Sequence, residues 1–270
     1  MNAHRARKRF GQNFLVDRAV LEDCLAAIDP RPQQRVIEIG PGLGALTERL
    51  LTRVAHIDAV EIDRDIVAHL QRRFLPCQLT LHSADALEFD FSQFGKDLRV
   101  VGNLPYNIST PLLFHLKTFS AMLCDMHFML QKEVVERMVA EPGGRDYGRL
   151  SVMLQCEFSV HSLFTVAAAA FDPAPKVESA FVRLVPLAQP LIEAEYSGMF
   201  ASVVATAFNQ RRKTLRNALQ GLLTGQDFEQ LGIDAGLRPE RLSGAQYAAI
   251  ARHLGRVNTH APIQVEKQHE

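Results

Sequence analysis

The sequence predicts an α/β fold, a doubly wound sheet followed by a small all-helical domain. Between residues 35 and 185, short apolar runs alternate with segments whose apolar residues recur at helical spacing. After Pro186 and Pro190, only helical spacing remains. A length of 270 residues fits one or two domains.

The predicted sheet builds up strand by strand. Arg35–Ile39 is a short β-branched run, and a glycine-rich turn joins it to a helix start. Ligands of such sheets bind at the carboxyl ends of strands, near the point where strand order reverses. The predicted strands are Arg35–Ile39, His56–Ile62, Gln78–His82, Leu98–Gly102 and Met126–Leu130, and the predicted helices between them are Ala45–Leu51, Asp63–Phe74 and Thr110–Phe119.

The remaining helices form the second domain. We therefore divide the chain into an α/β domain over residues 1–187, a helical domain over 190–257 and a flexible polar tail over 258–270. The helices predicted for the second domain are Tyr196–Asn209, Lys213–Leu223, Asp227–Leu231 and Ala245–Leu254.

Charge and composition restrict the partners. Lys and Arg number 30, as do Asp and Glu, so a nucleic acid must be bound by local basic patches. One patch is His4–Arg9, and the other contains Arg211, Arg212, Lys213 and Arg216. A single basic patch is more often a solvated face, so neither patch identifies an RNA-binding protein by itself.

Cysteines and apolar runs predict the cellular context. The four cysteines are far apart without a C-x-x-C pair, which argues against a zinc site or a disulfide framework. We expect reduced thiols in a cytoplasmic protein without a bound metal. No apolar run approaches eighteen residues, and no apolar segment follows the basic N-terminus, so we expect neither a membrane span nor a signal peptide.

Three strand ends carry the features of a nucleoside site. Gly40-x-Gly42-x-Gly44 allows backbone to approach a ligand, although Ala45 departs from the G-x-G-x-x-G fingerprint. Glu61 lies 21 residues after Gly40, where an acid accepts ribose hydroxyls. Asp85 can accept a hydrogen from an adenine amine, or it can be an ordinary turn aspartate.

The kind of nucleoside follows from what the glycine turn lacks. No Lys or Arg lies close after Gly40 to bind a pyrophosphate. This favours S-adenosylmethionine over NAD.

The run Asn103-Leu104-Pro105-Tyr106 follows the strand Leu98–Gly102. An aromatic amine is a poor nucleophile because its lone pair is delocalised into the ring. The Asn103 side-chain oxygen and a backbone carbonyl near Leu104 can accept both amine hydrogens, which frees the lone pair for a methyl group. Pro105 stiffens the turn, and Tyr106 offers a ring for stacking. A plain strand-end turn is the alternative interpretation.

A second aromatic residue precedes a proline-rich segment. Phe171-Asp172-Pro173-Ala174-Pro175 is held extended by its prolines. Phe171 is therefore either a stacking plate or a core residue.

These motifs occur in the order typical of one family. The chain resembles the ribosomal RNA adenine dimethyltransferases, especially the bacterial small-subunit group, from about Lys8 to about Leu219. The resemblance includes an N-terminal signature, Arg9-Phe10-Gly11-Gln12-Asn13-Phe14-Leu15, and the basic segment Asn209–Leu215. It implies a Rossmann-like class I S-adenosylmethionine-dependent methyltransferase sheet.

The resemblance also implies roles for individual residues. Asn13 and Leu15 would close over the cofactor, Gly40 would contact its methionine part, Glu61 its ribose and Asp85 its adenine. In the catalytic centre, Asn103, with Leu104 next to it, would contact both the cofactor and the target amine. Tyr106 and Phe171 would stack on the two faces of the target adenine. The residues expected to bind RNA are Arg7, Lys8, Arg9, Arg211, Arg212 and Lys213.

The implied substrate is a pair of adjacent adenosines in a hairpin loop near the 3′ end of small-subunit (16S) ribosomal RNA. The implied partner is the small ribosomal subunit or its assembly intermediate, bound by a monomer. The alternatives are a resistance-type dimethyltransferase of large-subunit RNA, an assembly or transcription factor without turnover and, more distantly, an NAD-dependent dehydrogenase.

Overall fold

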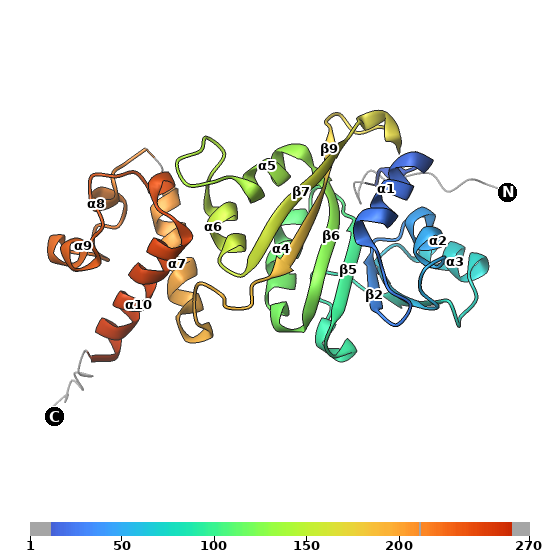
Figure 1. Cartoon of the computed structure of the whole chain (residues 1–270), viewed down its shortest axis with the longest axis horizontal. Helices are drawn as coiled ribbons and strands as arrows, with labels where there is room; N and C mark the ends of the chain where they lie inside the picture. Colours follow the sequence, from blue (N-terminus) through green and yellow to red (C-terminus); the bar gives the residue numbers. More distant parts are fainter. Residues whose placement is uncertain (1–11, 211, 261–270) are drawn as a thin grey trace, which may run out of the picture. The chain divides into compact units, whose positions relative to one another are not determined.

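The computed structural model describes residues 12–210 and 212–260, with the backbone alone for 258–260. This part of the chain divides into two compact units. The first unit contains the residues up to Val139 together with Phe158–Ala188, and it holds every strand in Figure 1. The second unit contains Ala140–Glu157 together with the residues from Gln189 onward, and it is helical.

The predicted domain boundaries differ from this division in one respect. The predicted break between 187 and 190 coincides with the division, but residues 140–157, predicted for the sheet domain, belong to the helical unit. The reason is packing, since Tyr147 is buried and donates a hydrogen bond to the Leu242 carbonyl at 2.9 Å. Val152 and Leu154 are also buried, on a helix that contacts two helices of the second unit.

A seven-stranded sheet runs through the first unit in the order β4-β3-β2-β5-β6-β9-β7. The strands from β4 to β6 are parallel, while β9 is antiparallel to both β6 and β7. A separate antiparallel pair joins β1 to β8. The strands are β1 (Phe14–Leu15), β2 (Arg35–Ile39), β3 (Ile57–Glu61), β4 (Leu79–Ser83), β5 (Leu98–Asn103), β6 (Leu123–Gln131), β7 (Phe158–Val166), β8 (Phe171–Asp172) and β9 (Ser179–Pro186).

Five α-helices belong to this unit, and their caps are specified locally. The Asp17 carboxylate accepts hydrogen bonds from the Ala19 and Val20 amides at the start of α1, and Asp63 caps α3 in the same way. Gly44, in the left-handed region at φ 82°, is the N-cap residue that precedes α2. The helices are α1 (Arg18–Ile28), α2 (Ala45–Leu50), α3 (Arg64–Arg73), α4 (Ser109–Lys117) and α5 (Lys132–Val139).

The predicted strands and helices of the sheet region are present, with their ends unchanged or shifted by at most three residues. The class of fold, a Rossmann-like α/β sheet with an attached helical unit, is confirmed. Helices α1 and α5 and the antiparallel strands β7 and β9 were not predicted as individual elements.

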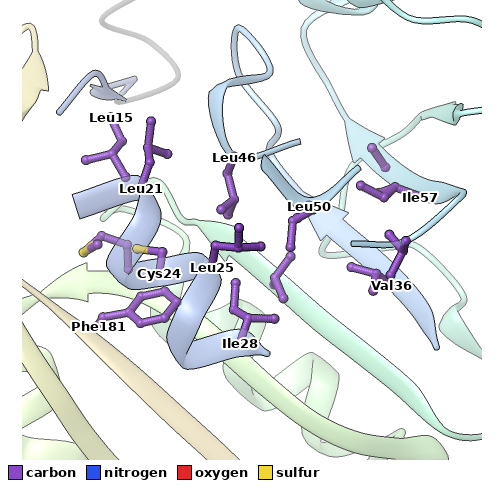
Figure 2. Close-up of a cluster of buried hydrophobic side chains, with 14 of the residues drawn as sticks. Leu15, Leu21, Cys24, Leu25, Ile28, Val36, Leu46, Leu50, Ile57 and Phe181 are labelled. Carbon is purple, nitrogen blue, oxygen red and sulfur yellow. The ribbon is translucent and has the colours of Figure 1, made fainter. Parts of the chain in front are cut away.

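A buried cluster of apolar side chains connects α1 to the sheet. Figure 2 shows Leu21, Cys24 and Leu25 of α1 lying among Leu46, Leu50 and other side chains of the cluster. Beneath the end of α1, Arg99 is buried and donates to both carboxylate oxygens of Asp125, at 2.6 and 2.9 Å, and to the Ile28 carbonyl at 2.7 Å. These charge-assisted bonds fix the C-terminal end of α1 to β5 and β6.

The second unit contains α6 (Arg149–Gln155), α7 (Ser197–Asn209), α8 (Leu215–Ala218), α9 (Gly225–Leu231) and α10 (Gly244–His260). The predicted helix Lys213–Leu223 is shorter than expected, since α8 ends at Ala218 and a turn that contains Gly221, at φ 85°, follows it. Helix α10 runs to His260, so the first three residues of the predicted tail are helical; the rest lie outside the described residues. None of the helices described is both long enough and apolar enough to cross a membrane.

Candidate functional site

A cavity of about 560 Å³ lies in the first unit at the carboxyl ends of β2, β3 and β5. The chain runs from β2 outward to β4 and then returns to β5 on the other side of β2, so the strand order reverses here. The cavity brings together nearly all the predicted cofactor-binding and catalytic residues of this unit. Those that line it are Asn13, Leu15, Gly40, Glu61, Asp85, Asn103, Leu104 and Tyr106.

The glycine turn after β2 gives the cavity a wall of bare backbone. Gly40, Gly42 and Gly44 have φ angles of 65°, 55° and 82°, which L side chains rarely adopt. A Cβ on Gly42 would lie 2.9 Å from the Phe14 ring, so the turn also packs too closely for a side chain. A ligand can therefore contact the main chain of this turn directly.

Two carboxyl groups are buried at the edge of this turn. Glu61 is 6% exposed and accepts a hydrogen bond from the Asp63 amide at 2.8 Å, while Glu38 is 2% exposed and accepts one from the Thr47 hydroxyl at 2.6 Å. Burial raises the pKa of Glu61 to about 7 and that of Glu38 to about 7, and the charge of Glu61 contributes to the shift of Glu38. The site thus contains two buried acids whose carboxyl pKa values are raised by desolvation.

Glu38 was missed as a site residue in the sequence. A signal existed, since an acid inside the apolar strand β2, next to a glycine turn, is unlike the rest of the strand.

Asp85 serves the turn and still faces the cavity. Its Oδ1 accepts a hydrogen bond from the Leu87 amide at 2.9 Å. A carboxylate has about four acceptor positions, so this bond leaves capacity for a ligand. The two interpretations of Asp85, turn residue and ligand acceptor, are compatible. Ile62, 47% exposed on the cavity wall, adds an apolar surface that sequence analysis did not identify.

The Asn103–Tyr106 turn is held at three points. The Asn103 side-chain amide donates to the Asn13 carbonyl at 2.8 Å, and because a carbonyl only accepts, the amide nitrogen must face it. The Leu104 amide donates to the Met129 carbonyl at 3.2 Å, and the hydroxyls of Tyr106 and Ser179 lie 2.6 Å apart. The Asn103 side-chain oxygen therefore does not face the Asn13 carbonyl, and Asn103 lines the cavity.

Phe171, predicted as a stacking plate, does not line the cavity. It is 4% exposed and belongs to the apolar cluster that also contains Leu15 and Phe181. The reason is strand pairing, because Phe171 of β8 lies opposite Leu15 of β1. The alternative interpretation, a core residue at the start of a proline-stiffened loop, describes this structure.

The predicted RNA-binding residues are only partly described. Arg7, Lys8, Arg9 and Arg211 lie outside the described residues. Arg212 and Lys213 are exposed at the start of the segment that leads into α8, in the second unit. Among residues 12–210 and 212–260, no group of three or more His, Cys, Asp or Glu side chains is placed to hold a metal ion.

Comparison with known proteins adds a consistent result. A family model described as "Ribosomal RNA adenine dimethylase" matches residues 3–255. The chain is 59% identical over 256 residues to a Nitrosospira multiformis protein named "Ribosomal RNA small subunit methyltransferase A", covering 95% of this chain and 99% of that one. A Thiobacillus denitrificans protein of the same name is 59% identical over 251 residues, covering 93% and 98%.

Two solved structures resemble the fold over most of the chain. A dimethyladenosine transferase from Plasmodium falciparum has a TM-score of 0.78 at 23% identity, covering 91% of this chain and 98% of that one. The 23S rRNA methyltransferase ErmE has a TM-score of 0.66 at 25% identity, with coverages of 90% and 99%.

Proposed function

Because the chain belongs to the ribosomal RNA adenine dimethylase family, we propose that it methylates two adjacent adenosines of small-subunit ribosomal RNA. Methyl groups pass from S-adenosylmethionine to the exocyclic amines in a hairpin loop near the 3′ end of 16S RNA, giving N6-dimethyladenosines during ribosome biogenesis. The observation that carries this proposal is the Asn103–Tyr106 turn, which faces the same cavity as the acids Glu61 and Asp85.

The residues of the cavity fit S-adenosylmethionine. Glu61 offers a buried carboxylate for the two ribose hydroxyls, and Asp85 offers an acceptor for the adenine amine. Gly40 lets the backbone approach the methionine part, while Asn13 and Leu15 lie at the cavity edge. When bound, the cofactor supplies an electrophilic methyl group on a sulfonium.

Asn103 and the main chain of the turn then act on the nucleophile. The Asn103 side-chain oxygen and the Leu104 carbonyl accept the two amine hydrogens, so the nitrogen lone pair points toward the methyl group. Catalysis consists of positioning and of electrostatic stabilisation of the developing ammonium. The methylated amine is acidic and loses its proton to water or a carbonyl, so no strong general base is assigned.

Tyr106 supplies a ring on which the target base stacks after leaving its RNA stack, which costs least in a loop. Arg212 and Lys213, with Arg211 and the basic residues Arg7, Lys8 and Arg9, bind RNA phosphates. The substrate is the small ribosomal subunit or its assembly intermediate, which places the protein in the cytoplasm. We propose that it acts as a monomer.

A large-subunit RNA specificity is the second candidate, and ErmE is the neighbour that raises it. The chemistry of the turn is the same for both substrates. The small-subunit candidate is favoured by relatives of that name that are 59% identical over nearly the whole chain, against 25% for ErmE.

The test is transfer of labelled methyl groups from S-adenosylmethionine to unmethylated small subunits. Large subunits and a Tyr106→Ala variant are the controls. Dimethyladenosine in small-subunit RNA alone supports the proposal. Transfer to large-subunit RNA instead would establish the second candidate. No transfer, with the cofactor bound, would favour an assembly factor without turnover.

A further inference from the structure

We propose that Ser179 is a positioning residue for the methyl transfer, because its hydroxyl fixes the orientation of the Tyr106 ring. The Tyr106 and Ser179 hydroxyl oxygens lie 2.6 Å apart, although the residues are 73 positions apart in sequence. The inference rests on the proposed function, in which Tyr106 is the surface on which the target base stacks.

Ser179 is a rigid support for this contact. It is the first residue of β9 and is fully buried, and it lies opposite Gln131 of β6 and Val166 of β7. A strand paired on both sides cannot shift easily. A buried hydroxyl must also have a hydrogen-bond partner, which Tyr106 provides.

The Tyr106 main chain is held at the other end of the residue. The Ser109 hydroxyl donates to the Tyr106 carbonyl at 3.1 Å, and Ser109 is itself buried. Tyr106 is half-buried and lines the cavity between these two contacts. Because its backbone and its hydroxyl are both anchored, the long axis of the ring is fixed and the ring cannot swing away from the cavity. Such preorganisation places a stacked base without an ordering cost during the reaction.

The second methyl transfer should depend on this support more than the first. The monomethylated amine carries an extra methyl group and one remaining hydrogen, so fewer orientations present its lone pair correctly. A ring that is free to tilt lets the base adopt the other orientations. Loss of the Ser179 hydroxyl is therefore expected to slow both transfers and to increase the proportion of monomethyladenosine.

The experiment compares Ser179→Ala, Tyr106→Phe and the double variant in methyl transfer to unmethylated small subunits. Each single variant should lower kcat about tenfold, with KM for S-adenosylmethionine unchanged and more monomethyladenosine. Each substitution removes the same hydrogen bond, the one between Tyr106 and Ser179. The double variant should therefore be no slower than the slower single variant. Ser151→Ala is the matched control, because Ser151 is also fully buried but caps α6 in the second unit.

Several outcomes would overturn the inference. The first is a double variant whose loss of kcat equals the product of the two single losses. The second is a ratio of monomethyladenosine to dimethyladenosine that stays unchanged in the variants. If Ser179→Ala does not fold, Tyr106→Phe still removes the bond without altering β9, and wild-type kcat and products would overturn the inference. No transfer by the unaltered protein would overturn the proposed function as well, whereas normal transfer with unaffected variants would overturn the inference alone.

Discussion

Glu38 and Glu61 are buried acids. The hydrogen bonds described above join them to the Thr47 hydroxyl and the Asp63 amide, and neither of these groups carries a positive charge. Burial favours the protonated form of a carboxyl and accounts for the pKa of about 7 at each residue. Such a group holds its proton more tightly in the folded than in the unfolded protein. The contribution of these two acids to the free energy of unfolding is therefore greatest below about pH 4.5 and falls as the pH rises toward 7.

This reasoning gives a prediction for stability. Glu38→Gln should flatten the dependence of stability on pH between about 4.5 and 7, because it removes one of the two titrating groups. Denaturant midpoints of the cofactor-free protein, measured across this range, provide the test. An unchanged pH dependence in the variant would show that Glu38 does not titrate there.

The ionised form of Glu61 gives the opposite trend for cofactor affinity. A carboxylate accepts hydrogen bonds from ribose hydroxyls more strongly than a protonated carboxyl does. S-adenosylhomocysteine should therefore bind more weakly as the pH falls below about 7. Glu61→Gln should weaken binding about tenfold or more and reduce this pH dependence. Calorimetric titration at several pH values tests both, and pH-independent binding by the unaltered protein would contradict the role of Glu61.

Asn103 has a sharper expected effect on turnover. Asn103→Ala removes the acceptor for the target amine and should lower kcat about 100-fold or more, by analogy with the loss of one oxyanion-hole group. Methyl transfer and binding of S-adenosylhomocysteine should be measured together. Substantial turnover by a correctly folded variant would remove Asn103 from the proposed mechanism.

At the level of whole elements, the approach of β2 to β5 sets the shape of the site. Gly102 of β5 lies where an added Cβ would collide with the Ile39 carbonyl oxygen of β2. Neither backbone can move without disturbing the sheet on which the glycine turn and Asn103 both depend. Gly102 is therefore required for lack of space, since its backbone has ordinary strand geometry that other residues could adopt.

Gly102→Ala should therefore destabilise the protein by about 1–3 kcal/mol, the usual cost of overpacking. Gly198→Ala is the control, because Gly198 is exposed in α7 and an added Cβ would meet nothing within 4 Å. That substitution should be neutral or slightly stabilising. Urea unfolding of both variants tests the expectation, and equal midpoints for the two would contradict it.

Elements also show what can be read from the sequence. The parallel strands and the residues at their ends were predictable, because short apolar runs and adjacent turns are local signals. Phe171 was ambiguous because its burial depends on pairing with Leu15, far away in the sequence. The role of residues 140–157 was missed for the same reason, since Tyr147 finds its partner at Leu242. Local patterns specify the site, whereas long-range contacts decide which side chains remain available to it.

At the scale of the whole molecule, the neutral overall charge leaves RNA binding to local patches. Arg212→Ala combined with Lys213→Ala should weaken RNA binding and reduce its dependence on salt, because fewer counterions are released. The slope of log affinity against log salt should become shallower by about 1 to 2. Arg72→Ala, an exposed arginine of α3, is the control. An unchanged slope in the double variant would exclude these residues from the RNA interface.

The antiparallel strand β9 also affects how the protein is made. Within the part of the chain that the structure describes, strand β7 pairs with β9 alone, and β9 lies between β6 and β7 although it follows both in the chain. During synthesis from the N-terminus, the edge of β6 therefore stays open, and β7 stays unpaired, until residues 179–186 have left the ribosome. Open strand edges are prone to wrong pairing. The nascent chain is thus most vulnerable to aggregation between the synthesis of β6 and that of β9.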